Sequence, residues 1–439
     1  MKNYIKKFSE DLFATLKPQE QLGLFLHSED STFIRFSQSK VRQNTSVHQH
    51  EVTLQFNKEQ RTLKMRFNLT LDLAHDMQSA THLIEDARKQ LMQMDPHPQF
   101  IAFKNNGQSE TFKKVDRPAD SEIPGLIYDT YKDTDLAGFW CSGPLRQASI
   151  NSEGQFHFFE TDYFFLDYSL YNGPKAAKGY YSAETFSMAE FEAQAQATKN
   201  KLNLLNRPTQ TIPRGLHNVY LEPMAMAEIV GTLSYQSLSQ GAFNKGYAPL
   251  KKLKDKELKL SPLFSLTENF DLGYSPLFNS MGELSPNKIE LIKNGELKSM
   301  LTSTTTAKEY NIETNFADIS EMPRSLEVRA GTLENKDILS KLGQGLYLSN
   351  LHYINYSDVQ TARMTGMTRF ACFYVDKGEI VGPIQDLRFD ESIYNVFGDN
   401  LIELTKESSV YVSTMTYLKR DLGAFKTPGA LIKNFNFTL

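Results

Sequence analysis

The sequence predicts an α+β protein in which strands come in runs and helices are few. Three observations predict this class. Short alternations of apolar and polar residues recur along the 439 residues, as they do in half-buried antiparallel strands. A few longer segments repeat apolar residues at helical spacing instead. A helix stop at Asn206, Arg207 and Pro208 separates a mixed α+β domain, residues 1–208, from a β-rich domain, residues 209–439.

The first domain is expected to contain strands followed by a helix, and then a connector over about residues 95–124. That connector is rich in proline, glycine and charge. The expected elements before it are a short helix with Ile5, Phe8 and Leu12 on one face, strands at Phe33–Phe36, Val52/Leu54/Phe56 and Leu63/Met65/Phe67, and a helix over about residues 74–94 with Ala80, Leu83, Ile84, Ala87 and Leu91 on one face.

A second strand-rich section follows the connector. The letters NSEGQ at 151–155 predict a turn between two aromatic runs, the second of which spans residues 156–171. Ser187 and Glu190 have the spacing of a capping box, which predicts a helix that reaches about Leu205.

The second domain opens with PMAMAEIVGTLSYQSLSQG, which we interpret as one amphipathic helix from Pro223 to Gly241. The rest of the domain is expected to be mostly antiparallel sheet. Segments 292–301 and 375–384 each have apolar residues around a glycine turn and predict β-hairpins, and residues 427–439 predict a final strand. The apolar stripe of the helix consists of Met226, Ile229, Val230 and Leu233.

Composition excludes several classes of function. A net charge of −4 and a pI near 6.2 argue against a general nucleic-acid or membrane-surface binder. No run approaches the ~20 apolar residues of a membrane span, and the first residues lack the apolar stretch of a secretory signal. The two cysteines, Cys141 and Cys372, cannot form a disulfide framework and are expected to be buried, inert thiols. We therefore expect a cytoplasmic protein with neither a nucleic-acid nor a membrane partner.

Residues able to do chemistry are scattered. Walker, G-x-G-x-x-G, G-x-S-x-G and C-x-x-C motifs are missing from the sequence. His48 and His50 would share one face of a strand, which a metal ion could use, although no third ligand is near them in sequence. A histidine pair at the edge of the core is the alternative interpretation.

The order of several segments resembles that of the TldD/PmbA (TldE) family, once labelled modulators of DNA gyrase. The resemblance runs from about residue 20 to residue 439. FIRFSQSKVRQNT and the strand pair before RFNLTLDL are similar to its N-terminal strands, and the resemblance continues through the INSEG turn. VYLEPMAMAEIV is similar to the V-L-x-P strand that leads into its central helix. LIKNGELKSML looks like a family hairpin. MTGMTRFACFYVDKGEIVGPI resembles the family's signature stretch, with Thr365–Gly366, Lys377–Ile380 and Pro383 in the matching places.

The resemblance also implies where a zinc site would lie. TldD-type subunits carry H-E-x-x-x-H after the V-L-x-P strand and a further cysteine ligand near the C-terminus. Counted from Pro223, the three motif positions are Gly231, Thr232 and Gln236. Glycine has no ligand atom, threonine is no base near neutral pH, and glutamine is a poor zinc ligand. The region LKRDLGAFKTPGAL has no cysteine. The chain therefore looks like the PmbA/TldE branch, with no catalytic, cofactor-binding or metal-ligating residue expected.

This resemblance implies a non-catalytic, metal-free subunit of a TldD/TldE-like metallopeptidase complex that acts on unfolded or modified peptides. Zinc is then expected in a TldD-type partner, and proteolysis only in the complex. Such peptides could add as a strand to an exposed sheet edge, for which Tyr347–Ile354 and Phe370–Val375 are the candidate segments. One alternative is a stand-alone homodimeric peptide-binding or scaffold protein. Another is an enzyme with a metal at His48 and His50. Neither charge nor motif supports a regulator of DNA gyrase.

Overall fold

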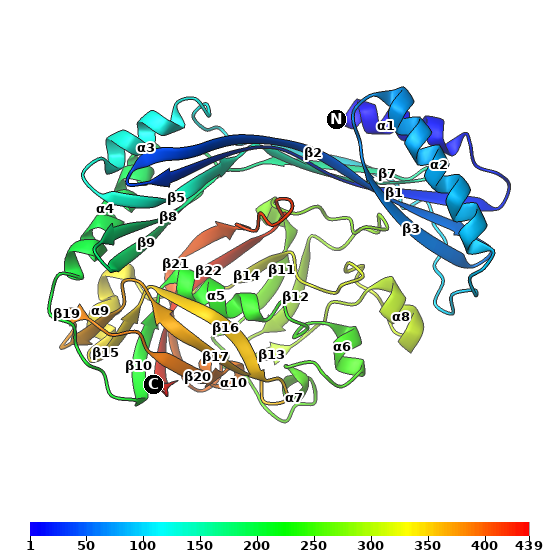
Figure 1. The fold of residues 1–439 in the computed structure, drawn as a ribbon. Coiled ribbons are helices and arrows are strands. Elements are labelled where there is room, and N and C mark those ends of the chain that lie inside the picture. The colour runs from blue at the N-terminus through cyan, green and yellow to red at the C-terminus, as the bar shows by residue number, and fades with distance from the viewer. Residues whose placement is uncertain (439) are drawn as a thin grey trace.

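The computed structural model describes residues 1–438 and confirms the α+β class. Its strands form two sheets, one of nine strands and one of 13 strands. Figure 1 shows the first sheet as a long arch above the second sheet and its helices. The elements of the first part are α1 (Lys2–Phe13), β1 (Glu20–Ser37), β2 (Lys40–Lys58), β3 (Arg61–Asn68), α2 (Leu73–Leu91), β4 (Gln108–Lys113), α3 (Ile123–Tyr131), β5 (Asp135–Ser142), β6 (Pro144–Asn151), β7 (Phe156–Asp162), β8 (Phe165–Asn172), β9 (Lys175–Tyr181) and α4 (Met188–Leu204).

The arch is built on the long antiparallel pair of β1 and β2. These strands stay paired from Glu20 opposite Lys58 to Ser37 opposite Lys40. The other edge of β1 pairs first with β6 and then with β5. β1 is therefore the strand that joins β2 to the rest of the sheet. Helices α1 and α2 cover one end of the sheet, where their apolar side chains join those of β1 and β2 in one core. The strands expected from alternation in this region are confirmed.

The helices of the first part follow the predicted signals. The apolar faces of α1 and α2 are buried as expected, except that Leu83 of α2 is only half-buried. The Ser187 side chain accepts a hydrogen bond from Glu190 N–H at 3.3 Å and so caps α4. The reciprocal half of the capping box is replaced, because the Ser187 N–H donates to the Tyr181 hydroxyl at 3.0 Å.

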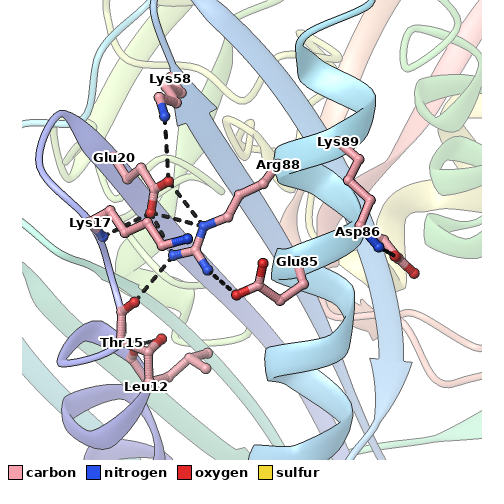
Figure 2. Close-up of polar contacts among 9 residues, drawn as sticks. All are labelled: Leu12, Thr15, Lys17, Glu20, Lys58, Glu85, Asp86, Arg88 and Lys89. Carbon is pink, nitrogen blue, oxygen red and sulfur yellow. Dashed lines mark hydrogen bonds and ion pairs between the residues drawn. The ribbon is translucent and has the colours of Figure 1, made fainter.

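A buried ion pair fixes α2 to the start of β1 (Figure 2). The Arg88 guanidinium donates to the Glu20 carboxylate, with Nη2 to Oε2 at 2.6 Å. The Glu20 side chain is fully buried, and Lys58 Nζ lies 3.7 Å from it. Burial acts to raise the pKa of Glu20, but the hydrogen bonds from Arg88 and from the Lys17 N–H outweigh it and leave that pKa below its usual value. Breaking such a pair leaves a buried charge without a partner.

The connector contains more structure than the sequence predicted. β4 lies inside residues 95–124 and pairs in parallel with β7. β4 does not show the apolar–polar alternation of a half-buried strand, because it lies at the edge of the sheet and four of its six residues are exposed. The predicted turn at 151–155 is confirmed, since β6 and β7 form an antiparallel pair on either side of it.

The second sheet is centred on β22, which pairs with β10, β14, β20 and β21. Its predicted hairpins at 292–301 and 375–384 are confirmed as β12–β13 and β18–β19. The elements of this part are β10 (Gly215–Leu221), α5 (Pro223–Thr232), α6 (Gln240–Asn244), α7 (Lys251–Lys254), β11 (Leu266–Asn269), η1 (Phe270–Leu272), β12 (Lys288–Lys293), β13 (Glu296–Leu297), α8 (Thr304–Tyr310), β14 (Ser325–Val328), η2 (Asn335–Asp337), α9 (Ile338–Leu342), β15 (Gly345–Leu348), β16 (Asn350–Asp358), β17 (Arg363–Arg369), β18 (Phe373–Asp376), β19 (Glu379–Pro383), β20 (Arg388–Ser392), α10 (Ile393–Val396), β21 (Leu401–Val412) and β22 (Ala424–Phe437).

The two sheets meet through aromatic side chains. Tyr163 and Phe165 of the first part pack in one cluster with Tyr274 and Val412 of the second. Hydrogen bonds reinforce this contact, because the Tyr163 hydroxyl donates to the Asp421 carbonyl at 2.8 Å. Among the helices of residues 1–438, none has the length and apolar character that crossing a membrane requires.

Candidate functional site

The candidate site lies at α5, the helix that carries the first two of the three motif positions, and at the turn that follows it. Glu222 precedes the helix and is held from two sides, by the Tyr347 hydroxyl at 2.5 Å and by Lys201 Nζ at 2.6 Å. The Pro223 carbonyl accepts from the Thr427 hydroxyl at 2.7 Å. The start of α5 is therefore fixed by α4, β15 and β22 together.

The apolar face of α5 is buried as predicted. Met226, Ile229, Val230 and Leu233 are each fully buried in the core of the second sheet. This burial explains why the helix is so well delimited although it carries few reactive groups. Packing alone accounts for its sequence on that face.

The prediction that one helix runs from Pro223 to Gly241 is wrong. α5 ends at Thr232, the chain then turns, and α6 begins separately at Gln240. Two features explain the early end. Glycine at 231 disfavours helix, and the Thr232 hydroxyl donates to the Ile229 carbonyl at 2.7 Å, which competes with the helical backbone pattern. The next N–H groups bond three residues back, as in a tightening last turn.

The early end separates the three motif positions. A Cβ added at Gly231 would meet no atom within 4 Å, so this position faces open space. Thr232 is buried, with its hydroxyl bonded inside the helix. Gln236 lies in the turn with a φ of +65°, outside the helix. The residues present do not fit a zinc ion, because they offer neither imidazole nor carboxylate and two of them no longer share a helical face with the third.

Glu228 is the one charged side chain within α5, and sequence reasoning did not assign it a role. Its Oε2 accepts the Leu351 N–H at 2.5 Å, at the start of β16. Burial raises the pKa of Glu228 to about 8, an effect that the nearby Lys178 partly opposes. No signal in the sequence marks this environment, because Leu351 and Lys178 come from distant strands.

The structure corrects the predicted peptide-binding edges. β18, which contains the second half of Phe370–Val375, is an interior strand with β15 on one side and β19 on the other. β15, at the start of Tyr347–Ile354, is also interior, between β10 and β18. Only β16 in this region pairs with a single strand, β17. An alternating pattern predicts a strand but not how many neighbours it has.

His48 and His50 lie on β2 with different partners. His48 is exposed and its Nδ1 lies 2.8 Å from Asp30 Oδ1, whereas the buried His50 has its Nδ1 2.9 Å from the Ser28 hydroxyl. Within residues 1–438, no group of three or more His, Cys, Asp or Glu side chains is arranged to hold a metal ion.

The remaining reactive groups lie apart from α5. Cys141 and Cys372 are free and buried, as predicted. Burial raises the pKa of Cys141 to about 12 and that of Cys372 to about 11. Two surface hollows, of about 390 and 650 Å³, have no motif position in their walls.

Comparison with known proteins defines the class of this fold. Residues 214–439, more than half of the chain, match the family model described as PmbA/TldA metallopeptidase C-terminal domain. The chain therefore belongs to the PmbA/TldD family, as its segment order predicted. A comparison with curated proteins found no match.

Solved structures share the fold over almost the whole chain. A "putative modulator of a DNA gyrase" from Thermotoga maritima matches with a TM-score of 0.78 and 15% identity, over 99% of this chain and 100% of that one. TldE from Thermococcus kodakarensis gives 0.75 and 16%, over 100% and 99%. A protein from Bacteroides thetaiotaomicron with the same description as the first gives 0.77 and 12%, over 100% and 98%.

Proposed function

We propose that this chain is the non-catalytic, metal-free subunit of a TldD/TldE-like metallopeptidase complex that acts on unfolded or modified peptides. The zinc ion and the general base belong to a TldD-type partner. This chain contributes structure and peptide contacts, and proteolysis appears only in the complex.

The observation that carries this proposal is the state of α5. The helix keeps its buried stripe, but the family's three metal-site positions hold a glycine, an internally bonded threonine and a glutamine beyond the helix end. Catalytic zinc needs three protein ligands and one open position, and the two histidine ligands of the motif and the cysteine ligand all lack a counterpart here. The helix thus keeps its buried apolar face but has no residues that could bind zinc or act as a general base at the motif positions.

The second candidate is a stand-alone homodimeric peptide-binding or scaffold protein with no peptidase role. Nothing in the fold requires a zinc-bearing partner, and folds are reused for recognition. The two functions differ in one respect that can be measured, namely whether cleavage appears when a TldD-type subunit is present.

The test compares the lone chain with the same chain co-expressed with a TldD-type subunit from its own source. We expect no stoichiometric zinc and no cleavage of an unfolded protein by the lone chain, and chelator-sensitive cleavage by a co-purifying complex. Thr232→Val, which keeps the shape of the side chain, should leave that cleavage unchanged. A His→Ala change in the partner's own H-E-x-x-x-H should abolish it.

Zinc at one ion per lone chain, or chelator-sensitive cleavage without a partner, would contradict the proposal and direct attention to His48 and His50. A homodimer that forms no complex and cleaves nothing would favour the scaffold function instead.

A further inference from the structure

Strand β2 is longer than β3 and leaves part of one edge unpaired. β1 pairs with β2 along its whole length, whereas β3 pairs only with residues 51–58, at the end of the arch near α2 (Figure 1). The Leu69 N–H extends this contact by one residue, because it donates to the His50 carbonyl at 2.8 Å. Within residues 1–438, no other strand pairs with the outer edge of residues 43–49. We call these residues, QNTSVHQ, the free edge.

The free edge is regular, so its backbone groups point outward in a fixed pattern. Its residues pair one to one with residues 29–35 of β1. The His50 carbonyl faces β3, and successive residues of a strand direct their backbone groups to opposite edges. The N–H and C=O groups of Asn44, Ser46 and His48 therefore face outward. All three residues are exposed.

The free edge lacks the features that usually protect an unpaired strand. Proteins protect such edges with proline, charged side chains or a bulge. QNTSVHQ contains no proline, lysine, arginine, aspartate or glutamate, and the bulge of the β1–β2 pair lies just outside it, at Arg42. The side chain of His48 turns toward β1, where its Nδ1 lies 2.8 Å from Asp30 Oδ1. An uncovered row of backbone donors and acceptors is what another strand needs for pairing.

The free edge does not match itself in a second copy of this chain. An antiparallel pair of identical strands has a twofold axis through one residue that faces its own copy. With the axis at Ser46, Arg42 of the copy faces His50, whose outer edge Leu69 already occupies. With the axis nearer the start of β2, the bulge at Arg42 enters the pairing. The geometry therefore favours a strand from a different protein chain.

Positive charges gather at one end of the free edge. Arg35, Lys40 and Arg42 are exposed. None of them belongs to an ion pair in the part of the chain that the structure describes. An acidic residue in an added strand would meet positive charge there that no carboxylate of this chain neutralises in an ion pair.

Acidic side chains close to the free edge are already engaged. Each one in the adjoining parts of β1 and β2 has an internal partner: Glu29 accepts from the Ser31 hydroxyl at 2.7 Å, Asp30 pairs with Arg146 at 2.5 Å, and Glu51 pairs with Lys419 at 2.6 Å. Asp135, at the start of β5, lies across β1, because β5 pairs with the opposite edge of that strand. The charges beside the free edge therefore complement an acidic partner.

We propose that the free edge pairs with an extended, acidic strand of another protein chain, which thereby adds to the arch. Antiparallel pairing is the more stable arrangement, and it places the carboxyl-terminal end of the added strand beside Lys40 and Arg42. Thr45 and Val47 are half-buried on one face of the free edge, so β-branched residues in the added strand suit them. This inference goes beyond the proposed function, because it concerns neither α5 nor the motif positions.

The test measures binding of a designed strand to the lone, full-length chain. The probe is a fluorescein-labelled peptide of seven alternating Thr and Val residues followed by two Glu residues. Two further forms of it carry N-methyl groups, one on every Val and one on every Thr. Because only one of these two sets of N–H groups faces β2, one form should bind like the parent peptide and the other at least tenfold more weakly. Equal Kd values for the two methylated forms would overturn the inference.

Ser46→Pro tests the edge from the side of the protein. It removes an outward N–H, so the facing carbonyl of the peptide loses its donor, and the Kd of the parent peptide should rise at least tenfold. Because this N–H does not face β1, the strand tolerates proline here, and S46P should keep the wild-type circular dichroism spectrum and unfolding midpoint. Ser46→Thr keeps the N–H and should leave the Kd unchanged. An unchanged Kd in S46P would contradict the proposal.

A charge reversal provides a second variant that leaves the backbone intact. The wild type should prefer the peptide that ends in two Glu residues over one that ends in two Lys residues. The double variant K40E/R42E should reverse this preference, because it replaces the positive end of the edge by a negative one. If both proteins prefer the same peptide, the assignment of an acidic partner is wrong.

Size-exclusion chromatography tests the remaining occupant, a second copy of this chain. A wild-type dimer that S46P dissociates would show that the free edge pairs with itself, and the inference would be wrong. A wild-type chain whose oligomeric state S46P leaves unchanged, together with the expected peptide binding, supports it. None of these readouts needs zinc or cleavage, so they succeed or fail independently of the proposed peptidase complex.

Discussion

His27 should make the stability of this protein fall as the pH drops below neutrality. The side chain is 6% exposed, its Nε2 has no hydrogen-bond partner, and it lies beneath the loop that carries Lys419. Burial, followed by the positive charge of Lys419, lowers the pKa of His27 to about 4. In the unfolded chain the pKa is about 6.5, so the unfolded state binds the proton first.

Proton linkage fixes the direction and the magnitude of this change in the free energy of unfolding. Between about pH 6.5 and pH 4 the unfolded state holds more protons than the folded state, so folding is progressively disfavoured as the pH falls. The full shift of roughly 2.5 pKa units corresponds to about 3 kcal/mol, of which about 2.5 kcal/mol is lost between about pH 7.5 and pH 4.5. Above about pH 7 the contribution of His27 is fully present.

The assay is urea unfolding of the wild type and of His27→Gln at these two pH values. Other titrating groups contribute to both proteins, so the difference between their pH dependences isolates His27. We expect the wild type to lose about 2.5 kcal/mol more than the variant on acidification. His82→Gln, a matched change at an exposed histidine, should behave as the wild type. Equal pH dependence in wild type and His27→Gln would refute the reasoning.

Three further predictions concern the ion pair, the motif positions and the thiols. Arg88→Met should lower the free energy of unfolding by about 3 kcal/mol, because it leaves the Glu20 carboxylate buried with its main partner removed, and adding Glu20→Gln should recover part of that loss in a urea titration. Placing histidine, glutamate and histidine at Gly231, Thr232 and Gln236 together should not create a zinc site, because the helix ends before the third position. Metal analysis should therefore find less than one zinc ion per chain. One tightly bound zinc ion per chain would contradict this and show that the end of the helix can change. The thiols of Cys141 and Cys372 should react with a thiol reagent only under denaturing conditions, because both are buried and their pKa values lie well above neutrality; fast labelling of the native chain would contradict this.

Most local structure of the first part could be predicted because its signals are local. The face of α1 and the cap of α4 depend on residues within a few positions of one another. The end of α5 escaped prediction because the apolar spacing continues to Leu233 while the Thr232 hydroxyl stops the helix. Strand β4 escaped because an exposed edge strand has little reason to alternate.

The order of family segments predicted one helix through all three motif positions, but the helix ends at Thr232 and leaves Gln236 in a turn. The open space at Gly231 was not predictable either, because it depends on how distant loops pack. The burial of Arg420 likewise depends on Ser31, Gly143 and Tyr163, which lie hundreds of residues away in sequence. Long-range contacts of this kind leave no periodic trace in the sequence.

The central position of β22 in the second sheet has a consequence for how the chain is made. β22 follows every other strand in sequence order, yet four strands pair with it. During synthesis β22 therefore leaves the ribosome after all the strands with which it pairs. Until then, the edges of these strands that pair with β22 are unpaired. The arch, whose strands are complete by Tyr181, can form earlier. We therefore expect the arch to form first and the second sheet, with its many non-local pairings, to close more slowly.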